Sequence, residues 1–123
     1  MRTIQLYATG SATATAAATV TIPAAGRIVG VQASVGIDSV TDNAQVRLEL
    51  SKAPANQIAT NGAIDPFLEV GMYGNFVTSG LSQFGLNQFF PVDVPVRQGE
   101  IINLHATVAG TAVYYANFII HYA

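Results

Sequence analysis

Hydrophobic and polar residues alternate along most of this chain with a period of two. Over residues 11–22 the alternation is almost unbroken, with alanines, a valine and an isoleucine on one side and a serine and threonines on the other. Successive side chains of a β-strand point to opposite faces, so this pattern is typical of a strand with one buried side. The sequence lacks the 3.6-residue period of an amphipathic helix. The pattern therefore predicts an all-β protein.

The same alternation predicts further strands along the chain. They lie at residues 4–8, 29–38, 44–51, 89–97, 100–109 and 111–122. Prolines and glycines interrupt the stretch 52–86, which is expected to hold two short strands, at 67–70 and 74–79. Turn signals recur about every ten residues, as in antiparallel sandwiches. The sequence thus predicts one domain over residues 1–123, an antiparallel β-sandwich of about eight strands that is jelly-roll-like.

Prolines and loop length give first expectations about how the strands are arranged. Pro91 and Pro95 cannot donate a backbone hydrogen bond, so they place the strand 89–97 at an edge of a sheet or at a bend. The connection 52–66 suits a crossing from one sheet to the other, and we expect it to make one.

The last two strands are expected to pair with each other. If their apolar sides coincide, Val108 lies opposite Ala112 and the loop 109–111 has three residues. Such loops commonly place a glycine in the left-handed conformation, and Gly110 can supply it. The sequence therefore predicts a closing hairpin.

The composition is unusually poor in charge. Hydrophobic residues make up 50% of the 123 residues and charged residues 10%, with five basic and seven acidic side chains and a net charge of −2. An ordinary soluble domain is about 25% charged. Five scattered cations do not form the basic stripe that a nucleic-acid binder needs, and the high hydrophobicity excludes a disordered chain. So few charges would cover a lone monomer poorly, and we expect self-association.

The N-terminal stretch resembles a targeting segment only in outline. A basic residue, Arg2, is followed by a stretch rich in alanine and threonine that runs to Ala25. Polar residues interrupt this stretch at nearly every second position, whereas a signal peptide needs a continuous apolar core. No window approaches the roughly 20 apolar residues of a membrane helix. We expect neither a signal peptide nor a membrane partner.

The two histidines are the only groups expected to titrate near neutrality. In the hairpin register His105 faces Tyr115, while His121 lies about 20 Å away along the ladder. Both imidazoles are predicted to lie on polar sides of their strands, exposed or at an interface. They are too far apart in this register to share a metal.

The remaining candidate groups do not form a catalytic pattern. No spacing selects two of the seven carboxylates as a general acid–base pair. Asp38 and Asp42 frame the loop 38–43, which could bind calcium but lacks the glycine and the terminal glutamate of an EF-hand loop. Nucleophile-elbow and phosphate-binding glycine motifs are absent, and there is no cysteine. The sequence predicts no enzyme and no catalytic, cofactor-binding or metal-binding residue.

Aromatic residues gather in the irregular middle and in the strand that follows it. The members of this cluster are Phe67, Tyr73, Phe76, Phe84, Phe89 and Phe90. An exposed row of rings could stack on sugars, but a sandwich also needs large residues in its core, and the chain has no tryptophan. Burial in the core or at a subunit interface is the favoured interpretation.

Residues 90–104 (FPVDVPVRQGEIINL), with the Gly-Thr turn and the aromatic strand that follow, resemble small viral jelly-roll proteins. Most similar are the decoration, or cement, proteins of tailed-phage heads, which are short, free of cysteine and rich in Ala, Thr, Val and Gly. The resemblance implies a non-enzymatic virion structural protein, made in the host cytoplasm and located on the capsid surface. It also implies a homotrimer that stabilises the head by bridging capsomers of the major capsid protein.

If the resemblance holds, the N-terminal segment and the Ala/Thr strand 11–22 are expected to make the subunit contacts. The predicted interface residues are Arg2, Ile4, Leu6, Tyr7, Thr13, Thr15 and Tyr115. Arg27, Arg47 and Arg97 would orient the partners rather than drive binding. The alternative hypothesis is a carbohydrate- or receptor-binding sandwich module of a phage tail or fibre, and a third is a small hydrolase.

Overall fold

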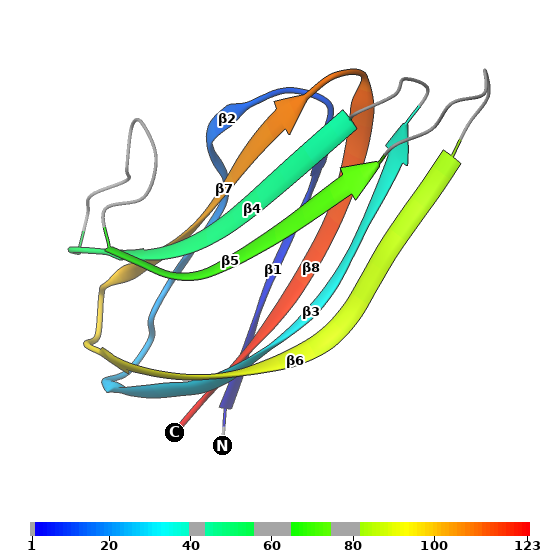
Figure 1. The fold of residues 1–123 in the computed structure, drawn as a ribbon. Coiled ribbons are helices and arrows are strands. Elements are labelled where there is room, and N and C mark those ends of the chain that lie inside the picture. The colour runs from blue at the N-terminus through cyan, green and yellow to red at the C-terminus, as the bar shows by residue number, and fades with distance from the viewer. Residues whose placement is uncertain (1, 40–43, 56–64, 75–81) are drawn as a thin grey trace.

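The structure is a computed structural model that describes residues 2–39, 44–55, 65–74 and 82–123, with the backbone alone at 15, 38–39, 44, 72–74 and 82–85. Within these residues the chain forms eight strands and no helix (Figure 1). The strands are β1 (Arg2–Gly10), β2 (Ala14–Thr21), β3 (Gly26–Ser39), β4 (Ala44–Ala53), β5 (Asp65–Gly74), β6 (Ser82–Val96), β7 (Ile101–Ala109) and β8 (Ala112–Tyr122).

The eight strands form two antiparallel sheets that pack face to face. One sheet has the order β1-β8-β3-β6, called sheet A below, and the other has the order β2-β7-β4-β5, called sheet B. The chain changes sheet at every connection except the one between β4 and β5, which is the connectivity of a jelly roll. The predicted all-β sandwich is confirmed.

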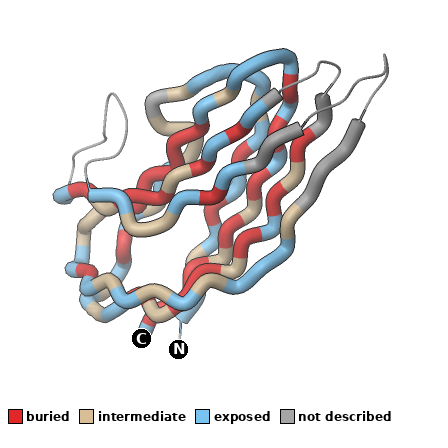
Figure 2. Tube along the Cα trace, in the orientation of Figure 1, coloured by how far each residue is buried: buried red, intermediate tan, exposed pale blue. Residues whose placement is uncertain are grey.

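The core lies between the sheets and is built from every second residue of each strand. In sheet A, Leu6 pairs with Phe118 and Phe118 pairs with Ala33, and all three point inward and are buried. In sheet B, Leu48 and Leu50 of β4 also point inward and are buried. Figure 2 shows the resulting alternation of buried and exposed positions along the strands. The period of two in the sequence is therefore the period of burial.

Proline placement confirms the predicted edge strand. β6 is an edge of sheet A and contains both Pro91 and Pro95. In the middle of the chain, β5 (Asp65–Gly74) includes the expected strand at 67–70 and is longer than predicted, and Gly74 is the only described residue of the strand expected at 74–79. Residues 75–81 lie outside the described part of the structure.

The predicted closing hairpin is wrong. β7 belongs to sheet B and β8 to sheet A, so Val108 is not paired with Ala112, nor His105 with Tyr115. Alternation determines which side of a strand is buried, and two strands facing each other across a sandwich bury their apolar sides as well as two strands in one hairpin. Gly110 does take the left-handed conformation, with a φ of 80°, at the turn that crosses between the sheets.

The expected crossing at residues 52–66 is also wrong. The strands on either side of it, β4 and β5, are neighbours in sheet B. Length alone does not distinguish a long loop between paired strands from a crossing between sheets. The crossings lie at the shorter connections, including the one at Gly99, whose φ is 89°.

Candidate interaction surface

The outer side of sheet A carries no charged group over its central rows. The residues that point outward there, called the aromatic–amide face below, are Thr3, Gln5, Tyr7, Thr9, Gly30, Gln32, Ser34, Gly36, Asn87, Phe89, Pro91, Val113, Tyr115, Asn117, Ile119 and His121. None of them is Asp, Glu, Lys or Arg. In a chain with twelve charged residues, this is the feature of the surface that most needs an explanation.

Three large aromatic rings of this face are exposed to solvent. Tyr7 is 60% exposed, Phe89 is 48% exposed and Tyr115 is 43% exposed. Tyr7 pairs with Asn117 and Thr9 pairs with Tyr115 in the β1–β8 ladder, so the two tyrosines are diagonal neighbours. Diagonal neighbours are about 7–8 Å apart, within reach of aromatic side chains. Large exposed rings are typical of surfaces that contact a partner.

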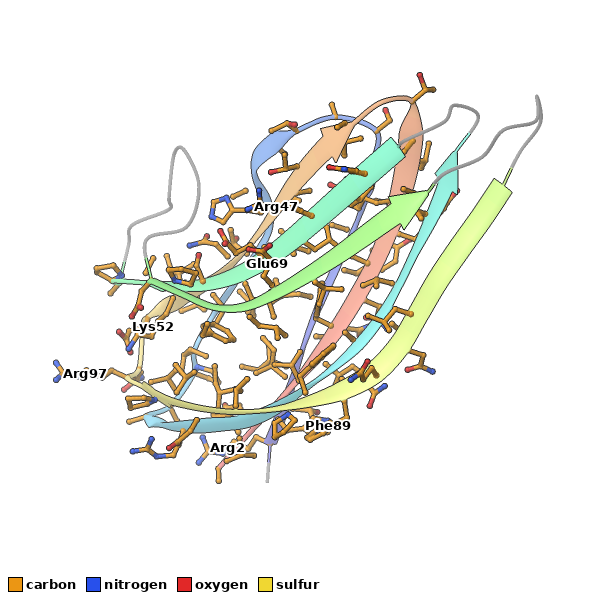
Figure 3. All side chains as sticks on the ribbon, in the orientation of Figure 1. Arg2, Arg47, Lys52, Glu69, Phe89 and Arg97 are labelled. Carbon is orange, nitrogen blue, oxygen red and sulfur yellow. The ribbon has the colours of Figure 1, made fainter. Side chains whose placement is uncertain are left out.

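The Phe89 ring lies across the sheet rather than upright on it. A Cβ built on Gly30 would overlap the outer end of the ring, so the ring occupies the space that any larger residue would fill. Its centroid is 5.8 Å from that of His121, with an edge-to-face angle of 63°. Figure 3 shows Phe89 on the side of β6 that faces away from sheet B.

Amide side chains pair across the strands of this face. Gln5 Nε2 donates to Asn117 Oδ1 at 2.7 Å, and Gln32 Nε2 donates to Asn87 Oδ1 at 2.5 Å. An amide side chain has two donor hydrogens and an oxygen with two lone pairs. Each pair therefore keeps both donor and acceptor capacity for a partner.

Charged groups border the face instead. Arg27 and Asp93 form an ion pair at 2.5 Å beyond Gly30 and Pro91, at one end of the sheet. Asp38 continues the row of β3 at the other end, and its side chain lies outside the described part. An uncharged centre with a polar rim is the usual composition of a protein–protein interface.

The outer side of sheet B differs, because charge is present at its centre. Arg47 Nε lies 3.3 Å from Glu69 Oε1 (Figure 3). Glu49 of β4 lies opposite Glu69 of β5 and opposite His105 of β7. Beside them, Ser51, Asn103 and His105 are buried, and their side-chain polar atoms have no hydrogen-bond partner among the described residues. Burying a polar group without a partner costs about 1–3 kcal/mol.

The prediction of an exposed imidazole is therefore wrong for His105, which is 5% exposed. Its outward position in β7 was foreseen, but alternation does not report what covers an outward residue. His121 is half-buried, on the outer side of the other sheet. The two histidines thus lie on opposite sides of the sandwich.

A small pocket of about 280 Å³ lies where β4 ends and β5 begins. It is lined by Lys52, Asp65 and Glu100 together with Ala53 and Pro54. Lys52 Nζ donates to the Pro95 carbonyl oxygen at 3.0 Å and lies 3.7 Å from Glu100 Oε2. Lys52 and Glu100 thus form an ion pair with each other, so their charges need no ligand to neutralise them.

The structure brings two of the predicted interface residues, Tyr7 and Tyr115, together on the aromatic–amide face. Arg2 stacks over the Tyr122 ring, with 5.4 Å from Cζ to the ring centroid. Ile4 is half-buried, and Leu6 is 2% exposed in the core of its own chain.

The other predicted contact strand lies apart from this face. Thr13 is exposed, and its Oγ1 accepts a hydrogen bond from the Val108 backbone N–H at 3.3 Å. The side chain of Thr15 lies outside the described part. Sequence analysis assigned Phe89 to the core or an interface and did not include it among the predicted interface residues. Its position in an edge strand, on the same side as Asn87 and Pro91, is a signal of exposure.

In the described residues no three His, Cys, Asp or Glu side chains come together in a group that could hold a metal ion. The loop considered for calcium lies outside them at residues 40–43. The same part of the chain contains no helix long and apolar enough to cross a bilayer.

Comparison with known proteins gives matches among solved structures alone. No protein-family model matches the chain, and no curated sequence does. Among solved structures, Eiger TNF from S. frugiperda is similar over 98% of this chain and 93% of that one, with a TM-score of 0.49 and 9% sequence identity.

Proposed function

We propose that this protein is a non-enzymatic structural subunit that assembles with copies of itself through the aromatic–amide face. The observation that carries the proposal is the absence of charge among the described side chains of that face, together with the exposed rings of Tyr7, Phe89 and Tyr115. A protein that functioned alone would gain nothing from keeping three large rings in water.

Symmetry explains why such a face suits a second copy of the same chain. Around a symmetry axis, a patch meets itself or its own neighbouring part, so a charge on it meets a like charge. The aromatic–amide face has none in its centre, and amides such as Gln5 and Asn117 can both donate and accept. The aromatic–amide face can therefore pack against a copy of itself. The outer side of sheet B is less suited to this, because Glu49 lies opposite Glu69 and a copy would bring further like charges.

The size of the face fits this use. Four strands about 4.8 Å apart, each contributing about eight residues of about 3.3 Å, cover on the order of 500 Å². Patches of roughly 300–600 Å² are the largest on typical monomers and are often functional. We propose a trimer, in which each subunit uses the face against two neighbours.

The capsid role is the second part of the proposal, and it is supported by the resemblance of residues 90–104 to phage decoration proteins. A trimer with an uncharged interior contact would expose its charged sheet B outward, toward capsomers and solvent. The assembly would then bridge neighbouring capsomers and add buried area that resists internal pressure.

The native mass of the purified chain tests self-association. Light scattering on a sizing column should give about three times the chain mass of 12.9 kDa. Phe89→Asp and Tyr115→Asp each place a charge on the face and should abolish the trimer while the chain remains folded by circular dichroism. Gln45→Asp, an exposed change on sheet B, is the matched control and should keep the native mass.

A monomeric wild-type chain at high concentration would overturn the proposal. The capsid role has its own test, which is sedimentation of the purified protein with empty heads of the phage that encodes it. Self-association without cosedimentation would reject the capsid role alone.

A second candidate function, glycan binding, is favoured by one observation. The exposed Phe89 ring lies beside His121 and next to the Gln32–Asn87 amide pair, which combines a stacking surface with hydrogen-bonding groups. It predicts a rise in melting temperature with a glycan that disappears in Phe89→Ala and persists in Tyr7→Ala. A glycan panel that leaves the melting temperature unchanged rejects it.

A further inference from the structure

The four edge strands of the two sheets differ in how well they are protected from pairing. An edge strand exposes a row of unpaired backbone N–H and C=O groups that another strand can bind. Natural sheets block such pairing with prolines, bulges, charges or short strands. In this sandwich the edges are β1 and β6 in sheet A and β2 and β5 in sheet B.

Three of these edges are blocked. β6 contains Pro91 and Pro95, and its register with β3 shifts between Ile28 and Gly30. β5 contains Pro66, and its register with β4 is also interrupted. The register of β2 with β7 shifts between Ala14 and Ala18. Each of these strands is a poor template for a further strand.

β1 has none of these protections. Its pairing with β8 is unbroken from Arg2 opposite Tyr122 to Gly10 opposite Tyr114. The strand contains no proline, and its only charge is Arg2, at the first position. A long, regular and uncharged edge is the kind that pairs with another strand.

We propose that β1 pairs antiparallel with β1 of a second copy, so that two copies of sheet A become one continuous sheet. A two-fold axis through Leu6 gives full overlap of the nine residues. It places Thr3 opposite the partner's Thr9 and Gln5 opposite the partner's Tyr7. Thr–Thr pairs and amide–aromatic pairs are favourable neighbours across strands, and no like charges meet in this register.

This contact deepens the proposed function, since it assumes self-association, but it uses the edge of sheet A rather than its face. A three-fold contact through the face and a two-fold contact through the edge would not close on a single ring. Together they would join one trimer to the next. That is the connectivity that a bridging protein requires.

Charge pairing at Thr3 and Thr9 tests the edge and its register. Thr3→Lys with Thr9→Lys puts a lysine opposite a lysine twice, and it should weaken the edge contact by at least about tenfold in Kd. Thr3→Lys with Thr9→Glu puts a lysine opposite a glutamate twice and should restore the contact. Both variants lose the hydrogen bond from Thr9 Oγ1 to the Tyr114 carbonyl oxygen, so that loss cancels in the comparison.

A third variant, Phe89→Asp, separates the edge from the face. On light scattering it should leave an edge-paired dimer, whereas Thr3→Lys with Thr9→Lys, which places lysines on both the edge and the aromatic–amide face, should leave a monomer. If the double-lysine variant assembles like wild type, the edge proposal is overturned whatever Phe89→Asp does. If the double-lysine variant dissociates while Phe89→Asp has no effect, the edge stands and the face of the proposed function is rejected.

Engineered thiols give a direct check, because the chain has no cysteine. Directly opposed residues of an antiparallel pair have Cα atoms about 4.5–5.5 Å apart, which a disulfide can span. Thr3→Cys with Thr9→Cys should therefore form a covalent dimer on oxidation, and Thr3→Cys with Tyr7→Cys, out of register, should not. Equal cross-linking of the two variants, or none in either, overturns the register.

Discussion

Tyr7 and Tyr115 are diagonal neighbours across the β1–β8 ladder, on the one side of the sandwich whose central rows lack charge. They are 108 residues apart in sequence, and the pairing of β1 with β8 brings them together. Tyr7 is 60% exposed and Tyr115 is 43% exposed, so both rings are accessible to a partner.

The two tyrosines should therefore act together in assembly. Tyr7→Ala and Tyr115→Ala should each raise the Kd of the oligomer, and the double variant should lose less than the sum of the two losses, with a coupling of about 0.5–1.5 kcal/mol. Sedimentation equilibrium on the four proteins of the cycle measures this coupling. Strict additivity would mean that the two rings contact different parts of the partner.

Gly30 should control the position of the Phe89 ring. Gly30→Ala would push the outer end of the ring off the sheet, because the added methyl group takes its place. The ring-proton chemical shifts of His121 should change as the edge-to-face contact is lost, and the oligomer should weaken. Gly71→Ala is the matched control, since nothing lies within 4 Å of the added atom. Unchanged His121 shifts in Gly30→Ala would contradict the ring placement.

Removing a hydroxyl should have opposite effects at two positions. Ser51 Oγ is buried with no partner, so Ser51→Ala should leave the free energy of unfolding unchanged or raise it by about 1 kcal/mol. Thr9 Oγ1 donates to the Tyr114 carbonyl oxygen at 2.8 Å, so Thr9→Val should lower it by about 1 kcal/mol. Urea unfolding of both variants measures the difference. A clear loss of stability in Ser51→Ala would show that its hydroxyl has a partner in solution.

Alkaline stability should depend on Tyr114. Burial raises the pKa of its hydroxyl above the ordinary value of 10.0, so the folded state holds its proton at a pH where the unfolded chain has released it. The stabilisation is complete below about pH 10 and is lost as the pH rises from there through the higher pKa of the folded state.

Tyr114→Phe should therefore lose less stability than wild type as the pH rises above about 10. Urea unfolding along this pH series measures the slope. Tyr7→Phe, at a ring that is 60% exposed, is the matched control. Parallel curves for wild type and Tyr114→Phe would argue that the hydroxyl ionises equally well in both states.

The sequence predicted which residues are buried better than which strands are neighbours. The inward positions of Leu6, Phe118 and Leu48 follow from local alternation, as does the edge position of β6 from its prolines. The partners of β7 and β8 do not follow from alternation. The sequence pattern of inward-facing apolar residues is the same whether the opposing strand is a neighbour in the same sheet or lies across the core in the other sheet. Only backbone pairing separates the two cases.

The candidate surface was foreseen in part. Tyr7, predicted as part of the N-terminal segment, and Tyr115 do lie on one face. Leu6 was selected with them, although alternation alone already places it on the buried side. Phe89 was predicted only to lie in the core or at an interface, although the alternation of its strand already places it on the side of Pro91 and Asp93 and opposite Phe90.

The connectivity of the sheets also sets the order in which this chain can fold. Among consecutive strands only β4 and β5 pair with each other, and β1 finds its sole neighbour in the last strand, β8. A chain emerging from the ribosome can therefore complete sheet A only after its final strand is made. Such non-local pairing is characteristic of proteins that fold in milliseconds to seconds rather than microseconds. Until then β1 has no strand to pair with, and its inward residues Ile4, Leu6 and Ala8 are not covered by the core. We expect chaperones to bind this segment during synthesis.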